Sequence, residues 1–261
     1  MEITYIIPTC GTGTLKETID SIKKQKIKPF EIIVVENGIK LKENFLDVWY
    51  IHLKKNYGYA KACNIGVAHS KAKYFALIND DAILPEDWAE KTLNEIKKDK
   101  NIAIVSCCVK RKDGQIQVVS VELNKYFEAV EVSYNKEGNL ANFTSVLISR
   151  EAFNKIGKLE EKFFIYYEDV DYSLRTIKNG FKIKILEDLF VLHKESSSKK
   201  ILKGKANFYL LRNKHYTILR NFGFKFYLKN FLKILRGDLK ILKKFPHYFF
   251  YYPLFLFYPK I

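Results

Sequence analysis

Two adjacent carboxylates stand at the end of an apolar run in the first third of the chain. The run 74–78 leads directly into Asn79-Asp80-Asp81. Neighbouring carboxylates repel each other unless a cation or a hydrogen-bonded hydroxyl, such as that of a ribose, stabilises them. The triplet therefore indicates a site for a divalent cation or a sugar. The simpler alternative is a polar loop that caps the helix starting near Pro85.

A second acidic cluster, Glu168-Asp169-Val170-Asp171, follows the aromatic-rich run 163–167. Burial beside aromatic side chains raises the pKa of a carboxyl group towards the value that a general base needs. The alternative is that the acids occupy the first turn of a helix, where the helix dipole and free N–H groups favour them. We expect this structural role for Asp171, and we take Glu168 and Asp169 as candidates for catalysis.

His193 ends a further apolar run, 189–192. A single histidine is more often a structural residue than a ligand. Together with carboxylates from elsewhere in the chain, however, its imidazole could complete a site for a divalent metal ion.

Short apolar strands alternate with helices over the first 110 residues. The expected strands are 3–7, 30–35, 48–53, 74–78 and 102–109, and the helices between them start near Leu15, Tyr59 and Glu86. This alternation predicts an α/β fold with a mainly parallel, doubly wound sheet and flanking helices. Ligands bind such sheets at the carboxyl ends of the strands, so we expect the polar residues that follow three of these strands to converge there.

The pattern changes after residue 110. The expected strands are now 115–121, 129–134, 144–148, 181–185 and 189–192, with helices over 150–156 and after Asp171, and a helical stretch reaches Phe245. We therefore expect a catalytic domain over 1–204 and a C-terminal helical region over 205–261.

Several common site types are disfavoured by the sequence. The turn after the first strand has Gly11 and Gly13 but Lys16 in place of the third glycine of a dinucleotide-binding fingerprint, and no P-loop sequence occurs. The four cysteines form no C-x-x-C pair, so neither a zinc site nor a disulfide framework is expected. They favour a reducing compartment.

The net charge of +16 is unevenly distributed over the 261 residues. Residues 201–261 hold 13 Lys and Arg but a single acid, Asp238, which is a net charge of +12 and leaves +4 for the first 200 residues. A basic excess usually indicates nucleic acid or an anionic membrane surface. No apolar stretch is long enough to predict a membrane-spanning helix.

Within this tail, residues 222–245 predict a strongly amphipathic helix. Its basic stripe is formed by Lys225, Lys229, Lys233, Arg236, Lys240 and Lys243, and apolar side chains lie opposite. Aromatic residues follow over 248–258. These features are typical of a helix that lies in an anionic membrane interface. The alternatives are that the helix packs on its own catalytic domain or on a second copy of the chain.

Taken in order, several segments resemble the family 2 glycosyltransferases of the GT-A fold, in particular rhamnosyltransferase- and galactofuranosyltransferase-type enzymes of polysaccharide synthesis. The resemblance runs from residue 3 to about residue 221. It is most specific at 56–66, which fit the pattern N-x-G-x-A-x-A-x-N-x-G. The other matching segments are Tyr5-Ile6-Ile7-Pro8-Thr9, 15–22, 31–38, Asn79-Asp80-Asp81, 164–175, His193 and 209–213.

The resemblance implies a role for individual residues. Thr9 and Glu36 would face the base and ribose of a nucleotide sugar, Asp80 the ribose or diphosphate, and Asp81, with His193, a Mn²⁺ or Mg²⁺ ion. Asp169 would be the catalytic base and Glu168 would help to place the acceptor. The implied donor-binding set is Pro8, Thr9, Glu36, Asn37, Asn56, Gly58, Lys61, Asn64, Asn79 and Asp80.

Three positions depart from the family pattern. Asn79 stands where the metal-binding D-x-D motif begins, Glu36 where aspartate is usual, and Cys10 where an aromatic residue is common. The departures at Asn79 and Glu36 motivate one alternative function, a catalytically inactive glycan-binding or scaffold relative.

The leading hypothesis is an inverting, metal-dependent glycosyltransferase. It would use a nucleotide-sugar donor and a lipid-linked or oligosaccharide acceptor at the cytoplasmic face of the cell membrane. An inverting transfer needs a base for the acceptor hydroxyl and a positive charge near the leaving diphosphate. The second alternative is a nucleic-acid-binding protein that uses the basic tail. We do not expect a nucleic-acid partner, because most of the excess charge lies outside the α/β domain.

Overall fold

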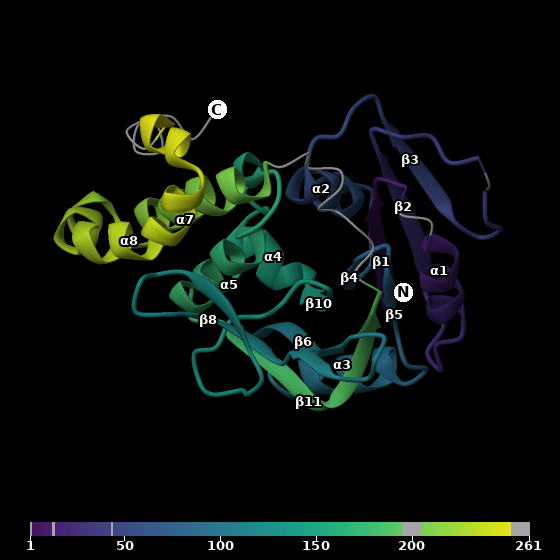
Figure 1. Ribbon diagram of the computed structural model, residues 1–261. Coiled ribbons are helices and arrows are strands. Elements are labelled where there is room, and N and C mark those ends of the chain that lie inside the picture. The colour runs from purple at the N-terminus through teal and green to yellow at the C-terminus, as the bar shows by residue number, and fades with distance from the viewer. Residues whose placement is uncertain (1, 12–13, 43, 195–204, 252–261) are drawn as a thin grey trace.

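The computed structural model describes residues 2–11, 14–42, 44–194 and 205–251. Figure 1 shows a curved sheet flanked by helices, with α7 and α8 together at one end. The strands are β1 (Ile3–Thr9), β2 (Glu31–Asn37), β3 (Trp49–Leu53), β4 (Tyr74–Ile78), β5 (Ala82–Ile83), β6 (Ile102–Lys110), β7 (Ile116–Val118), β8 (Ser120–Leu123), β9 (Ala129–Val132), β10 (Ser145–Ser149) and β11 (Lys182–His193). The helices are α1 (Leu15–Lys23), α2 (Tyr59–His69), α3 (Trp88–Lys98), α4 (Arg150–Ile156), α5 (Glu168–Lys178), α7 (Ala206–Phe222) and α8 (Phe224–Lys244), with short 3-10 helices η1 (Glu161–Phe163) and η2 (Pro246–Tyr251).

The main sheet has the strand order β3-β2-β1-β4-β10-β6-β11-β5, with β7 paired to β6. The first four strands of this order are parallel, and β10 runs antiparallel to both of its neighbours. The register aligns Thr9 with Glu36, so β1 and β2 end side by side. The parallel half of the sheet therefore presents its carboxyl ends at one edge, as the sequence predicts.

Alternate residues of the central strands enter two separate cores. Tyr5 and Ile7 of β1 pack with α1 and α3, whereas Ile6 packs with α2, α4 and α5. All seven residues of β1 are buried, which is why this strand is a continuous apolar run rather than an alternating one. The α/β fold with helices on both faces is confirmed.

Several details differ from the expected elements. The mainly parallel sheet also contains antiparallel strands, because β10 lies between β4 and β6 in the opposite direction and β5 and β7 pair antiparallel to β11 and β6. The two strands expected after residue 180 are one strand, β11, whose register against β6 shifts between Leu186 and Phe190. Helix α3 starts at Trp88, because residues 85–88 form a turn in which the Trp88 N–H donates to the Pro85 carbonyl.

The C-terminal helical stretch is two helices that pack on each other. They are separated by Gly223, whose φ of +84° favours glycine. Helix α8 buries Tyr227, Ile234 and Asp238, so the alternative in which this helix packs on its own chain is correct for one of its faces. None of the helices in the described ranges is long and apolar enough to cross a membrane. The aromatic residues expected to act at 252–258 lie outside the described residues.

Asp238 is the acid that interrupts the apolar side of this helix in the sequence, and it lies in a buried polar cluster. Its carboxylate contacts Lys214 Nζ at 2.7 Å and His215 Nε2 at 2.9 Å, and His215 Nδ1 lies 2.6 Å from the hydroxyl of Tyr227. Burial would raise the pKa of Asp238, but His215 and Lys214 outweigh this effect and hold it below its ordinary value. The cluster ties α8 to α7 through charges as well as apolar contacts.

Candidate active site

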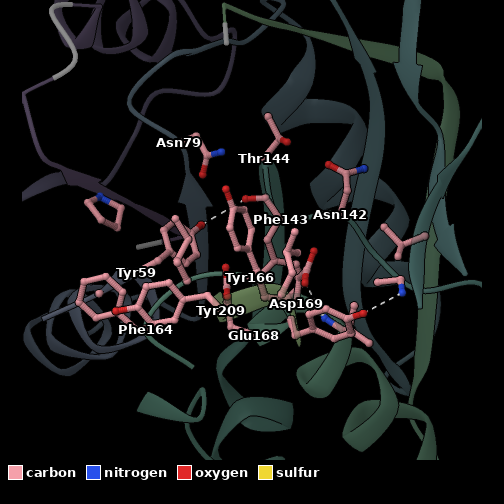
Figure 2. A pocket seen from close by; sticks show the side chains of 18 of the residues that line it. Tyr59, Asn79, Asn142, Phe143, Thr144, Phe164, Tyr166, Glu168, Asp169 and Tyr209 are labelled. Carbon is pink, nitrogen blue, oxygen red and sulfur yellow. Dashed lines mark hydrogen bonds between the residues drawn. The ribbon is translucent and has the colours of Figure 1, made fainter. Parts of the chain in front are cut away.

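A cavity of about 800 Å³ opens where the strand ends meet the segment before α5. One wall comes from the ends of β1, β2 and β4 and the turn before α2, and the other from residues 164–170 and the start of α7. Figure 2 shows the rings of Tyr59, Phe164 and Tyr209 gathered near Glu168, with Asn79 on the opposite side. Residues from distant parts of the sequence thus share one space.

The Asn79–Asp81 triplet lies in the first wall, directly after β4. Asp80 accepts a 2.5 Å hydrogen bond from the Thr9 hydroxyl, and its main-chain carbonyl accepts one from Thr14. Thr9 itself is buried and does not line the cavity, so its contact is with Asp80. The end of β1 therefore holds Asp80 in place.

Asp81 and His193 come together although 112 residues separate them in the sequence. Antiparallel pairing aligns His193 of β11 with Ala82 of β5, and His193 Nε2 lies 3.1 Å from Asp81 Oδ1. The other ring nitrogen, Nδ1, lies 3.2 Å from Oε1 of Gln117. A carboxylate and an imidazole are side chains that can bind a Mn²⁺ or Mg²⁺ ion whose other ligands are substrate phosphates and water.

No group of three or more His, Cys, Asp and Glu residues that could hold a metal occurs within the part of the chain described. The described residues place two groups of the types that bind metals, Asp81 and His193, next to each other. The hydrogen bond from the Thr9 hydroxyl engages one carboxylate oxygen of Asp80, Oδ2.

The turn before α2 is built by amide side chains. Asn37 Nδ2 donates to Asn56 Oδ1 at 3.0 Å and to the Gly58 carbonyl at 3.2 Å, while Asn37 Oδ1 accepts from the Tyr57 N–H. Gly58 has φ +86°, and a Cβ there would lie 2.4 Å from the carbonyl oxygen of Phe164. Only glycine allows this close approach between the two walls.

Besides Thr9, three residues of the implied donor-binding set do not line the cavity. Glu36 is buried, accepts from the Leu41 N–H and lies 3.3 Å from His52. Asn64 exchanges two hydrogen bonds with the main chain of Leu159. Lys61 pairs with Glu161 at 3.4 Å on the surface. The structure brings together the other members, apart from Thr9, at the cavity.

Glu168 and Asp169 begin α5 and line the opposite wall. Glu168 is buried, and its Oε2 has no hydrogen-bond partner within the residues described. Burial, and next the charge of Asp169, raise the pKa of Glu168 well above its ordinary value. Burial also raises the pKa of Asp169, although a 2.7 Å hydrogen bond from the Val170 N–H opposes the shift. A carboxyl pair of this kind is suited to accept a proton near neutral pH.

Asp171 has the structural role expected from its position. It is fully buried and pairs with Arg175 at 2.9 Å and with Arg220 at 3.1 Å. The two neighbouring acids face the cavity while this third one is neutralised behind them, because side chains on successive residues of a helix point in different directions.

An aromatic wall is the main part of the site that sequence reasoning missed. The rings of Phe164 and Tyr209 stack with centroids 5.2 Å apart and an interplanar angle of 15°, and Tyr59 and Tyr166 line the cavity beside them. The aromatic run 163–167 was a signal for this wall. No periodicity identifies Tyr59, or the contributions of Asn142, Phe143 and Thr144, which precede β10.

Cys10 also lines the cavity. Burial, and next the negative charge of Asp80, raise the pKa of its thiol to about 11. The group is therefore a neutral thiol at physiological pH and not a nucleophile. All four cysteines are free.

Comparison with known proteins identifies the family. The family model described as glycosyl transferase family 2 matches residues 4–157. The chain is 23% identical over 202 residues to the dTDP-rhamnosyl transferase RfbF of Shigella flexneri, covering 72% of this chain and 68% of that protein. It is 26% identical over 211 residues to the O-antigen chain rhamnosyltransferase RfbN of Salmonella typhimurium, covering 74% of this chain and 66% of that protein. An uncharacterized glycosyltransferase of Rickettsia typhi is 27% identical over 187 residues, covering 67% of this chain and 58% of that protein.

Solved structures support the same fold. A crystal structure of S. aureus TarS, residues 1–349, aligns with a TM-score of 0.59 at 16% identity, covering 85% of this chain and 66% of that one. A crystal structure of GalNAc-T7 with UDP, GalNAc and Mn²⁺ aligns with a TM-score of 0.62 at 16% identity, covering 76% of this chain and 44% of that one. The chain has the GT-A architecture, and it belongs to glycosyl transferase family 2, where its relatives include rhamnosyltransferases.

Proposed function

We propose that this chain transfers a sugar from a nucleotide-sugar donor to a saccharide acceptor with inversion of configuration. The observation that carries the proposal is the cavity itself. It is lined on one side by Asn79–Asp81 with His193 and on the other by Glu168 and Asp169. A group for the leaving diphosphate and a base for the acceptor thus lie on different sides of one space, as an inverting displacement requires.

In the proposed donor half, Pro8, Asn37, Asn56 and Gly58 contact the nucleotide, and Asp80 contacts the ribose or diphosphate. The network that Asn37 makes with the turn supports this role, because it fixes the turn before any ligand arrives. Glu36, Lys61 and Asn64 act in this proposal from outside the cavity, through the loops that they bind.

Asp81 and His193 would hold Mn²⁺ or Mg²⁺, which when bound neutralises the charge that develops on the departing diphosphate. Asp169 takes the proton of the acceptor hydroxyl. As it does so, the oxygen of that hydroxyl forms a bond to the anomeric carbon of the donor sugar, and the bond from that carbon to the phosphate oxygen breaks. Glu168 orients the acceptor. Its unpartnered Oε2 supports this role, because a buried carboxylate oxygen is stabilised by a hydroxyl donor.

A screen of UDP-, dTDP- and GDP-sugars tests the proposal. Each donor is offered with and without Mn²⁺, and release of the nucleoside diphosphate is followed together with thermal stabilisation. We expect stabilisation by one nucleotide class and release that depends on an added saccharide acceptor. Stabilisation without release for every donor and acceptor would instead support the inactive glycan-binding alternative.

We also propose that the enzyme acts at an anionic membrane surface, on a lipid-linked acceptor. Helix α8 supports this with three faces: one buried on α7, one with exposed apolar side chains, and one basic. The exposed apolar side chains are Phe224, Leu228, Leu232 and Leu239, and the basic face beside them holds Lys225, Lys229, Lys233, Arg236, Lys240 and Lys243. Apolar and basic strips side by side are suited to the interface of a bilayer that contains acidic lipids. We place the protein at the cytoplasmic face.

Vesicle flotation tests the membrane proposal. We expect binding to vesicles with phosphatidylglycerol, weaker binding to pure phosphatidylcholine, and loss of binding when Leu228 and Leu232 are both changed to Glu. The matched control is Leu46→Glu, which changes an exposed leucine just before β3, at the opposite end of the molecule in Figure 1. Equal flotation of all variants, or a concentration-dependent dimer that uses this face, would contradict it.

A further inference from the structure

The segment that leads into α5 has an unusual backbone. Phe164, Tyr166 and Tyr167 have φ of 64°, 67° and 71°, a region that side chains other than glycine rarely adopt. Such a conformation is unfavourable by itself and persists only where the surrounding structure imposes it. Glu168 and Asp169 follow immediately, so the direction of their side chains depends on what holds this segment.

The contacts that hold it come from α7, which lies after the catalytic segments in the sequence. Asn213 Nδ2 lies 2.9, 2.7 and 2.8 Å from the carbonyl oxygens of Phe163, Ile165 and Tyr166. Arg212 Nη2 donates to the carbonyl of Phe163 at 2.9 Å, and Arg212 Nε donates to Oδ1 of Asn213 at 2.9 Å. Asn213 is fully buried, so its amide group lies entirely within the protein.

The opposite side of the segment is held by the turn of the donor half. The Tyr59 N–H donates to the Phe164 carbonyl at 2.6 Å, and Gly58 allows the approach. The segment is therefore fixed between two elements, the start of α2 and the middle of α7. Neither Arg212 nor Asn213 lines the cavity.

We infer that Asn213 is a positioning residue for catalysis, which acts by holding residues 163–167 in the conformation that directs Glu168 and Asp169 into the cavity. Arg212 orients the Asn213 amide. The inference rests on the proposed function for its kinetic consequence. Its structural consequence, the placement of the two carboxyl groups, does not depend on any substrate.

The surroundings of the carboxyl pair provide a readout of its placement. The ionisable groups that interact with the pair are Tyr59 and Cys63 of α2, Tyr166 and Tyr167 of the segment, and Glu131 of β9. Burial raises the pKa values of the tyrosines and the thiol, so these groups are uncharged where the pair titrates. Burial of the pair, the repulsion between its two members and the charge of Glu131 favour the protonated pair. A segment that relaxes would expose the pair to water and lower its pKa values towards the ordinary range.

The test is a carbon-13 carboxyl NMR titration of the full chain, with Glu168 and Asp169 assigned by Glu168→Gln and Asp169→Asn. We expect Asn213→Ala to move both titrations to lower pH by about one unit or more, and Asn213→Ser, which keeps one donor, to move them less. The matched control is Asn221→Ala, because Asn221 lies on the same helix and donates to Asp171 of α5 at 2.8 Å. This control should lose stability without moving either titration.

Once a donor and an acceptor are known, kinetics provide the second readout. Asn213→Ala should lower kcat by about tenfold or more while the KM for the donor changes little. If Asn213→Ala lowers only the Tm and leaves both titrations where they are in the wild type, the inference is overturned. Failure of every donor to react would overturn the proposed function. The NMR titration would then still test whether Asn213 positions Glu168 and Asp169.

Discussion

The two walls of the cavity are built in different ways. The donor wall consists of strand ends from a parallel sheet, where buried apolar runs fix the backbone and short turns carry Asn79, Asp80 and Asp81. The base wall consists of a segment with left-handed residues before α5, held by hydrogen bonds from Asn213 and Arg212. The donor wall takes its geometry from the main sheet, and the base wall takes it from side chains far along the chain.

The difference has a consequence for how each wall responds to substitution. Truncating a side chain of the donor wall removes a group that we propose to bind the donor, but it leaves the strand ends in place, because the sheet defines them. Removing a hydrogen bond behind the base wall releases backbone whose conformation is unfavourable by itself. Substitutions should therefore act locally on the first wall and over several residues on the second.

The largest effect is expected for Asp169, the proposed base. Asp169→Asn should lower the rate of sugar transfer by about 10²–10⁴-fold, because the amide cannot accept the acceptor proton. Donor binding, measured by thermal shift, should remain, since the donor wall is unchanged. Transfer by the wild type should fall as the pH falls through the raised pKa of this carboxyl. Full activity in Asp169→Asn would remove this residue as the base.

A smaller effect is expected for the cation pair of the donor wall. Asp81→Asn and His193→Gln should each weaken Mn²⁺ binding by about tenfold or more, measured by titration in the presence of UDP, dTDP or GDP. Asp188→Asn, which changes an exposed acid on β11, is the control and should bind Mn²⁺ as the wild type does. Unchanged binding in both variants would place the cation elsewhere.

The contact between the two walls can be tested at Gly58. Gly58→Ala should lower the free energy of unfolding by more than the roughly 1–3 kcal/mol expected from its φ alone, because the new Cβ also meets the Phe164 carbonyl. Gly223→Ala is a closely matched control, since Gly223 has φ 84° and ψ 167° against 86° and 167° at Gly58, with nothing within 4 Å of its Cβ position. Equal losses in urea denaturation would mean that the walls do not constrain each other.

The smallest effect concerns stability. The pKa of Glu168 is higher in the folded chain than in the unfolded one, so the folded chain binds more protons between these values. Stability therefore falls as the pH rises through this range. Glu168→Gln should raise the free energy of unfolding by at least about 1 kcal/mol at neutral pH, the equivalent of one pKa unit. This gain in the free energy of unfolding should vanish at pH values below the ordinary pKa of glutamate. If the variant were more stable by the same amount at all pH values, burial of the Glu168 charge would not be the cause.

The sequence predicts the donor wall better than the base wall for a physical reason. Apolar runs that end in polar residues fix both the strand and its end, so the convergence of Thr9, Glu36 and Asp80 at one edge of the sheet could be expected from local patterns. The local patterns did not show that the Thr9 and Glu36 side chains lie outside the cavity. The resemblance to the family pointed to Asp169 and His193. The antiparallel insertion of β10, the stacking of Phe164 on Tyr209 and the hydrogen bonds of Asn213 depend on tertiary packing, and no periodicity encodes them.

Glu36 illustrates the limit of a motif. Its place at the end of β2 is as expected, but its longer side chain reaches the Leu41 N–H and His52, outside the cavity. Position along a strand is set by the register, whereas the direction of a flexible side chain is set by whichever partners it meets.

The buried carboxylate of Asp238 determines what kind of attachment the C-terminal helices can provide. A helix joined to its domain only by a flexible linker would act as a tether, which limits distance and leaves orientation free. Helix α8 is instead fixed to α7 by Lys214, His215 and apolar contacts, and α7 carries Tyr209 at the cavity. When α8 contacts a surface, the orientation of the cavity relative to that surface is therefore fixed by the packing of α8 on α7.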